Sequence, residues 1–343
     1  MLKGLKRGVL RVLRDLGAMG AVARSSWRQK RLLILCYHSL SVDQEHEWKR
    51  PLFFTPEEFD ARLELIGKHR LNVLTLEEGL HRLRQGTLPA RSAVLTFDDG
   101  SADFHDLVAP RLRRLGYPAT VYVSTYYIEK GLPIFMLMVS YVLWKGRHKQ
   151  LGPDPDFGLN RAIGLSTREG RLEAERAIMG HVTALRLSAG DRDAVAERLA
   201  GRLGVDYAEL RRRRVLQLMT PQEIASVTGQ GFDVQLHTHR HRTPDDQQAF
   251  TEEILENRRR IEAMTGGAAR HFCYPSGVYS TPGLGWLNGL GVVSATTCVP
   301  GLATVESPSL LLPRLVDTAG LSPVEFEGWL TGLSHVLPRR RTA

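Results

Sequence analysis

Cysteine is scarce in this chain, with three residues in 343. Because their number is odd and each lies in an apolar, strand-like segment, we interpret Cys36, Cys273 and Cys298 as free, buried thiols. Free thiols suit a reducing compartment. Cys36 and Cys273 stand next to polar motifs, but packing in the core is the favoured interpretation for both.

Long hydrophobic runs are also lacking. The longest one after the N-terminal region, from Leu132 to Trp144, is shorter than the roughly 20 residues that a helix needs to cross a bilayer. Near the N-terminus, Arg11, Arg14 and Asp15 interrupt any apolar run of the length of a secretory signal. We therefore expect a cytoplasmic protein. A hydrophobic content of 43% and a charged content of 24% are typical of a soluble globular chain.

Acidic residues are almost absent from residues 1–31, where nine Lys or Arg face the single acid Asp15. Eight of the nine net positive charges therefore lie in this segment, which argues against nucleic-acid binding by the rest of the chain. The segment predicts a basic amphipathic helix over 1–31. Its apolar face would comprise Leu2, Leu5, Val9, Leu13 and Leu16. Two interpretations stay open: residues 1–28 contact an anionic membrane from its cytoplasmic side, or the helix packs on the folded body. Residues 336–343 form a second basic segment, a short tail.

Strand-like segments alternate with helical patterns along the chain. The strand-like segments are Leu32–Tyr37, Ala93–Phe97, Ala119–Val123, Phe232–Leu236, His271–Tyr274, Val292–Thr296 and Leu311–Val316. Helix starts are marked by capping boxes, such as Thr55 with Glu58 and Thr220 with Glu223. The alternation predicts an α/β fold with a parallel sheet, open or closed into a barrel. In either form, ligands gather at the carboxyl ends of the strands.

The pattern changes between about 126 and 219, where strands are lacking and Arg, Ala, Leu and Glu are dense. One helix is predicted to open at Ser166 with Glu169, and another to cover Arg192–Arg202. We interpret this stretch as a helical insertion that caps the mouth of the site.

Three polar motifs follow predicted strands: Asp98-Asp99-Gly100, the pair His237 and His241, and the segment 270–277. Adjacent carboxylates after a buried strand are costly unless a cation or a proton holds them. Two histidines four residues apart can supply nitrogen ligands to one metal ion. One Asp and two His leave a coordination position for water, as in catalytic metal sites. The three motifs therefore predict a metal-assisted hydrolase.

On these motifs, the chain resembles the polysaccharide deacetylase superfamily, built on the NodB-homology domain, from about Leu32 to about Leu333. The resemblance implies an irregular (β/α)7 barrel over 32–335 with a helical insertion between the first and second catalytic motifs. It implies that Asp98 is the general base, that Asp99, His237 and His241 bind one divalent metal ion, and that Arg270 orients Asp98. The backbone amide of Tyr274 would stabilise the oxyanion, with Pro275 shaping the substrate loop.

The sequence Tyr37-His38 at the end of the first strand is similar to a subgroup associated with exopolysaccharide. We expect Tyr37 to contact substrate and His38 to contact it or protonate the leaving amine. Arg314, near the end of the last predicted strand, is a further candidate for lining the pocket. A second candidate acid is His335, in a Leu-x-His match near the C-terminus.

The expected activity is metal-dependent removal of N-acetyl groups from an amino sugar in a glycan or glycan precursor. For a chain on the membrane face, a lipid-linked oligosaccharide or a nucleotide sugar is the expected substrate. Zn²⁺ is the expected metal, although Asp-His-His ligands also suit Co²⁺, Ni²⁺ or Fe²⁺. Two alternatives stay open: hydrolysis of an O-acetyl or formyl group, and a non-catalytic carbohydrate-binding barrel.

Overall fold

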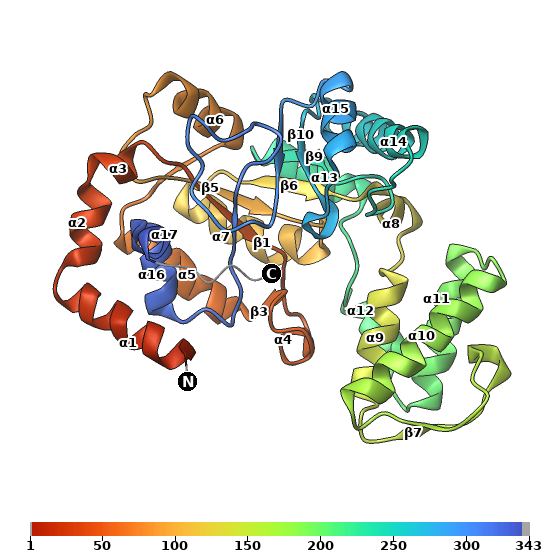
Figure 1. Ribbon diagram of the computed structural model, residues 1–343. Coiled ribbons are helices and arrows are strands. Elements are labelled where there is room, and N and C mark those ends of the chain that lie inside the picture. The colour runs from red at the N-terminus through yellow and green to blue at the C-terminus, as the bar shows by residue number, and fades with distance from the viewer. Residues whose placement is uncertain (1, 338–343) are drawn as a thin grey trace.

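The computed structural model describes residues 2–337, and its centre is a curled sheet ringed by helices (Figure 1). In this range, seven strands follow the order β11-β10-β9-β6-β5-β1-β12, and β4 pairs with β5 outside that path. Their bounds are β1 (Leu33–Tyr37), β4 (Asn72–Leu74), β5 (Ser92–Phe97), β6 (Thr120–Val123), β9 (Asp233–Leu236), β10 (His271–Cys273), β11 (Ser294–Thr296) and β12 (Leu315–Val316). Every pairing in this sheet is parallel, as helical connections between strands require.

The two ends of the sheet meet through the segment before β12. Thr296 in β11 forms a parallel bridge with Leu312, whose amide donates to the carbonyl of Ala295 at 2.9 Å. The predicted irregular barrel is therefore confirmed, and each of the seven predicted strands contributes to the path. The short strands β2 (Ser39–Leu40), β3 (Phe53–Phe54) and β4 were not predicted, because two or three residues are too few to show an alternating pattern.

Helices cover the outside of the barrel, and polar caps fix where several of them begin. The barrel helices are α4 (Glu45–Trp48), α5 (Pro56–Lys68), α6 (Leu76–Gln85), α7 (Ala109–Leu115), α13 (Pro221–Gly229), α14 (Gln247–Thr265), α15 (Thr281–Gly289), α16 (Pro323–Thr331) and α17 (Leu333–Val336). Thr55 and Glu58 cap α5 reciprocally, and Thr220 and Glu223 do the same for α13, as predicted.

The insertion forms a helical lobe at one side of the barrel (Figure 1). Its main elements are α8 (Thr125–Lys130), α9 (Phe135–Lys145), the hairpin β7 (Gln150–Leu151) and β8 (Ile163–Gly164), α10 (Arg168–Ala184), α11 (Ala189–Arg202) and α12 (Tyr207–Arg212). Buried side chains between Phe135 and Val215 make a hydrophobic cluster separate from that of the barrel. The helix predicted to open at Ser166 begins one residue later, because Thr167 accepts the capping hydrogen bond from Gly170.

The N-terminal segment is not the single helix predicted over 1–31. It forms α1 (Leu2–Asp15), α2 (Ala18–Arg24) and α3 (Ser26–Gln29), with Gly17 at a φ of 78° between the first two. Leu10 is fully buried, and Arg7 forms an ion pair with Glu325 of α16. Helix α1 therefore packs against α16 of the barrel. Of the predicted basic tail, residues 338–343 lie outside the described residues.

Candidate functional site

The carboxyl ends of the central strands bring the predicted motifs to one place. Asp98 and Asp99 follow β5, His237 follows β9, and His38 follows β1. These strands are neighbours or near neighbours in the parallel sheet, so their ends meet at the same edge of the barrel. Polar side chains that are far apart in sequence therefore line a common cavity.

Asp99, His237 and His241 converge on one point. The Nε2 atoms of His237 and His241 lie 3.3 and 3.2 Å from the same oxygen of Asp99, Oδ1. The Nδ1 atom of His237 lies 2.8 Å from the carbonyl oxygen of Cys273, which makes Nδ1 the donor and turns Nε2 toward Asp99. One oxygen and two nitrogen donors within 4.8 Å of one another fit a divalent metal ion.

Left-handed backbone conformations orient the candidate metal-binding side chains. Asp99, Thr238 and His241 have φ values of 73°, 62° and 55°, which are uncommon for residues with side chains. The turn at Asp99 lets two consecutive carboxylates reach one site although they would point to opposite faces of a strand. At Gly100, with φ 81°, an added Cβ would lie 2.7 Å from Cγ1 of Val123, so a side chain does not fit there.

Helix α14 holds the histidine segment from behind. The side chain of Asn257, fully buried, accepts a hydrogen bond from the His237 amide at 2.9 Å and donates to the Val123 carbonyl at 2.9 Å. Glu253, also buried, accepts from the Arg240 amide at 2.7 Å. Sequence reasoning missed both residues, because nothing in the sequence relates a helix position to a loop residue 13 or 20 positions earlier.

Arg314 holds Asp98, and the expected contact from Arg270 is wrong. Nη1 and Nη2 of Arg314 each lie 2.8 Å from an oxygen of Asp98. Arg270 is half exposed and lies 3.8 Å from Glu77 instead. Arg314 is itself fully buried, so the expectation that it contacts substrate is also corrected. It was singled out only for its place in the last predicted strand. In the structure it directly precedes β12, and its guanidinium lies against Asp98.

The Asp98–Arg314 pair sits among thiols. Sγ of Cys36 and Sγ of Cys273 lie 3.4 and 3.5 Å from Oδ2 of Asp98. Burial raises the pKa of the Asp98 carboxyl, but the Arg314 guanidinium outweighs burial and holds this pKa well below its usual range. Burial, opposed by Arg314, raises the pKa of both thiols well above their usual range, so they are neutral donors. Cys298 departs from the prediction, because it is exposed and lines the cavity.

His38 lies beside this pair, as the prediction requires. Its Nε2 atom is 4.0 Å from Oδ2 of Asp98, and its side chain is mostly buried at the cavity wall. The other candidate acid, His335, lies against Trp27 with the ring centres 5.6 Å apart, at the end of α17.

Three further predicted contacts are corrected by the structure. The amide of Tyr274 donates to the carbonyl of Thr296 at 3.3 Å, so it is already used in the sheet. Tyr37 packs in the core, stacked on Phe97 at 5.4 Å between ring centres. Pro275 is buried, and Ser276 lines the cavity in its place. These residues border the site motifs in sequence, but Tyr37 and Tyr274 pack in the main hydrophobic core.

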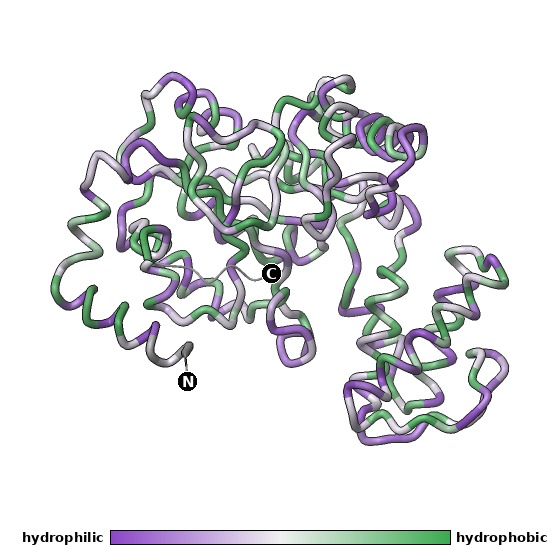
Figure 2. Tube along the Cα trace, in the orientation of Figure 1, coloured by the Kyte–Doolittle hydropathy of each residue, from purple (hydrophilic) through white to green (hydrophobic). Residues whose placement is uncertain are grey.

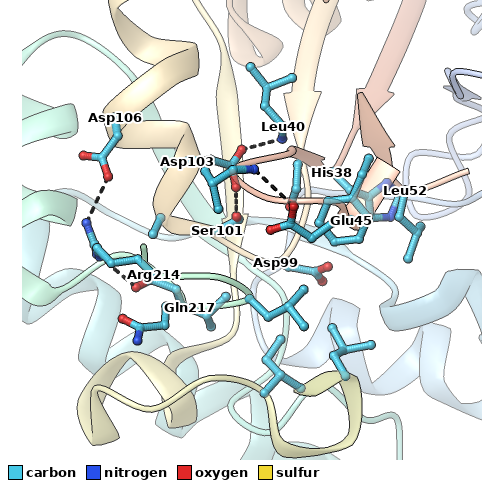
Figure 3. A pocket seen from close by; sticks show the side chains of 18 of the residues that line it. His38, Leu40, Glu45, Leu52, Asp99, Ser101, Asp103, Asp106, Arg214 and Gln217 are labelled. Carbon is cyan, nitrogen blue, oxygen red and sulfur yellow. Dashed lines mark hydrogen bonds and ion pairs between the residues drawn. The ribbon is translucent and has the colours of Figure 1, made fainter. Parts of the chain in front are cut away.

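A narrow crevice extends from the site along the insertion (Figure 3). In it, Asp103 accepts a hydrogen bond from the Leu40 amide at 2.6 Å and another from the Ser101 hydroxyl. Burial raises the pKa of Asp103 to about 8. On the opposite wall, Arg214 is paired with Asp106 at 3.1 Å, so this guanidinium is not free to bind an anion.

The polysaccharide deacetylase family profile matches residues 85–148 and 205–294. The unmatched stretch between them lies inside the helical insertion. A curated relative, the poly-β-1,6-N-acetyl-D-glucosamine N-deacetylase of Staphylococcus epidermidis, is 31% identical over 74 residues. That match covers 22% of this chain and about a quarter (26%) of the relative's length.

Solved structures share the fold. The Streptococcus pyogenes deacetylase PplD in complex with acetate superposes with a TM-score of 0.59 and 19% identity, covering 88% of this chain and 98% of that one. IcaB from Ammonifex degensii gives a TM-score of 0.54 and 16% identity, covering 88% of this chain and 97% of that one. At these levels of sequence identity, the similarity shows a shared fold and nothing more. The family profile identifies a polysaccharide deacetylase domain in this chain, and the curated relative agrees with it.

Proposed function

We propose that this chain is a metal-dependent hydrolase that removes N-acetyl groups from an amino sugar in a glycan or glycan precursor. The observation that carries the proposal is the convergence of Asp99, His237 and His241 beside the Asp98–Arg314 pair, in one cavity. The match to the polysaccharide deacetylase family supports the substrate class.

Asp99, His237 and His241 would hold the metal ion. Both imidazoles direct Nε2 to the carboxylate, and the fixed Nδ1 of His237 keeps its ring in this orientation. When bound, a divalent cation polarises an acyl oxygen and lowers the pKa of a coordinated water. Zn²⁺ suits this ligand set best, with Co²⁺, Ni²⁺ or Fe²⁺ as alternatives.

Asp98 and His38 would move the proton. Arg314 keeps Asp98 ionised at neutral pH, so its carboxylate can accept a proton from the attacking water. The same stabilisation makes Asp98 a weak base. His38, with Nε2 4.0 Å from Oδ2 of Asp98, is placed to take this proton from the carboxylate. The water oxygen bonds to the acetyl carbon. The amide nitrogen then takes the proton from His38 as the carbon–nitrogen bond breaks, so that a neutral amine and acetate leave.

The test is product analysis on the full chain loaded with Zn²⁺ or Co²⁺. Oligomers of N-acetylglucosamine, an O-acetylated glycan and an N-formyl amino sugar are incubated with the protein and analysed by mass spectrometry. Acetate and a free amine from the first substrate are expected. Release from the O-acetyl or formyl substrate alone would assign a different acyl group. Binding of oligomers without any release would favour the non-catalytic barrel.

The proposal extends to the membrane surface. On α1, Val9, Val12 and Leu16 are 44%, 58% and 77% exposed, whereas Arg7 faces the body through Glu325. An exposed apolar stripe on a basic helix supports peripheral contact with an anionic bilayer, and hence a lipid-linked precursor as substrate. None of the described helices is long and apolar enough to span a membrane.

A further inference from the structure

The cavity that holds the candidate metal ligands has one apolar wall. This cavity, of about 420 Å³, contains Asp98, Asp99, His237 and His241. Its apolar lining comprises Leu52, Tyr127, Ile134, Met136, Leu137 and Met179. All but Leu52 belong to the helical insertion or the turn that begins α9. The insertion therefore supplies part of the cavity surface next to the candidate reacting groups.

Part of this wall lies outside the hydrophobic cores of the protein. Leu52, Met136 and Leu137 belong to none of the four hydrophobic clusters found in residues 2–337. Met136 is 49% exposed, while its neighbours Met138 and Val139 on α9 are fully buried. Helix α9 is hydrophobic over most of its surface (Figure 2). One face fills the core of the insertion, and the other leaves aliphatic surface open in the cavity.

Polar groups that could recognise sugar hydroxyls are few on the same surface. Apart from the candidate catalytic and metal residues, the polar groups of the lining belong to Ser124, Arg240, Ser276 and Cys298 and to the hydroxyl of Tyr127. The Ser124 hydroxyl donates to the His237 carbonyl at 2.9 Å, and Arg240 is paired with Glu253 at 3.0 Å. No Asn, Gln or Trp side chain lines this cavity among the described residues. Such a surface offers contact area to an alkyl chain and few hydrogen bonds to successive sugars.

We propose that the amino sugar reaches the metal site joined to an aliphatic chain, and that the wall of Leu52, Ile134, Met136 and Leu137 binds the first part of that chain. This inference rests on the proposed function and specifies its substrate as a lipid-linked amino sugar rather than a free polysaccharide. Flexible methionines suit an aliphatic chain, because they adapt to it without a fixed hydrogen-bonding pattern.

The experiment compares methyl and octyl glycosides of N-acetylglucosamine, both below the micellar concentration, as substrates of the full metal-loaded chain. Because each buried methylene contributes binding energy, kcat/KM for the octyl glycoside should exceed that for the methyl glycoside at least about tenfold. In the double variant Met136→Gln/Leu137→Asn this ratio should fall toward one. The matched control Leu172→Gln changes an exposed leucine of α10 outside the cavity and should keep the ratio.

Equal kcat/KM values for the two glycosides, or an octyl preference that survives Met136→Gln/Leu137→Asn, would overturn the inference. Preference for an N-octanoyl over an N-acetyl methyl glycoside would also overturn it, because the wall would then bind an alkyl chain of the acyl group and not a chain joined to the sugar. Absence of acetate release from every glycoside would instead contradict the proposed function. Calorimetric binding of both glycosides to Asp98→Asn then tests the wall alone, with the octyl glycoside expected to bind about tenfold more tightly.

Discussion

Arg314 and Asp98 form a bidentate ion pair inside the barrel, with both nitrogen–oxygen distances at 2.8 Å. Arg314 also donates to the carbonyl of Thr297 at 3.0 Å, which fixes the fork from the other side. The pair sets both the charge and the direction of the carboxylate next to the candidate metal ligands. It is the part of the site on which the first prediction depends.

Replacing Arg314 by Lys should lower kcat by about 100-fold or more, because a single ammonium cannot hold both oxygens of Asp98. Without the guanidinium, burial should raise the pKa of Asp98, and the acidic limb of the pH–rate profile should move to higher pH. The control is Arg270→Lys, which changes a half-exposed side chain at Glu77 and should leave both quantities unchanged. Equal losses in the two variants would restore Arg270 as the orienting residue.

The purified chain should carry about one divalent ion per molecule. The double variant His237→Ala/His241→Ala should lose it, since two of three ligands are removed together. Asp99→Asn should weaken metal binding, whereas Asp98→Asn should retain the metal and lose turnover. Metal content is measured by atomic emission on dialysed protein. If Asp98→Asn loses as much metal as Asp99→Asn, the division of roles between the two carboxylates is wrong.

Asn257 should act on the metal site without touching the metal. Asn257→Ala removes the acceptor for the His237 amide and the donor to Val123, so metal affinity should fall about 10- to 100-fold. Titration with Co²⁺, followed by its absorption spectrum, measures this directly. Leu255→Gln, an exposed position on the same helix, is the control. A lower melting temperature with unchanged Co²⁺ affinity would limit Asn257 to a role in folding.

Asp103 should make stability depend on pH. Its folded-state pKa of about 8 lies above the ~3.9 expected in an unfolded chain, so the folded state keeps a proton that the unfolded state has lost. The free energy of unfolding should therefore fall as pH rises from about 4 to about 8, by at most about 1.4 kcal/mol per pH unit from this group. Asp103→Asn should flatten that slope in urea unfolding at several pH values. A slope identical to that of the unchanged protein would remove Asp103 as its source.

The apolar stripe on α1 should bind anionic vesicles. The full chain should sediment with them and be released as salt screens the attraction, and neutral vesicles should not retain it. Val9→Gln/Val12→Gln/Leu16→Gln should abolish sedimentation while the buried contact of Leu10 stays intact. This variant is preferable to deleting residues 1–28, because Arg28 is buried and bonds to the carbonyls of Ser92 and Leu330. Unchanged sedimentation of the triple variant would contradict the proposed contact.

Local patterns in the sequence were enough to predict most strands and helices of the fold. The seven barrel strands are apolar runs, and the capping boxes at Thr55 and Thr220 mark helix starts through contacts within four residues. The structure of the N-terminal segment was more difficult to predict from the sequence. Its helical pattern continues past Gly17, but the chain turns there so that Leu10 and Arg7 can pack on α16.

At the site, the sequence by itself determined which residue types gather at the strand ends: Asp98 and Asp99 after β5, His237 and His241 after β9. It could not determine which arginine meets Asp98, because Arg270 and Arg314 both stand next to barrel strands in the sequence. Only the tertiary structure decided this, since the buried Arg314 side chain lies against Asp98 while Arg270 stands at the amino end of β10, beside Glu77. A contact between residues 216 positions apart depends on strand order, and strand order arises from packing of the whole barrel.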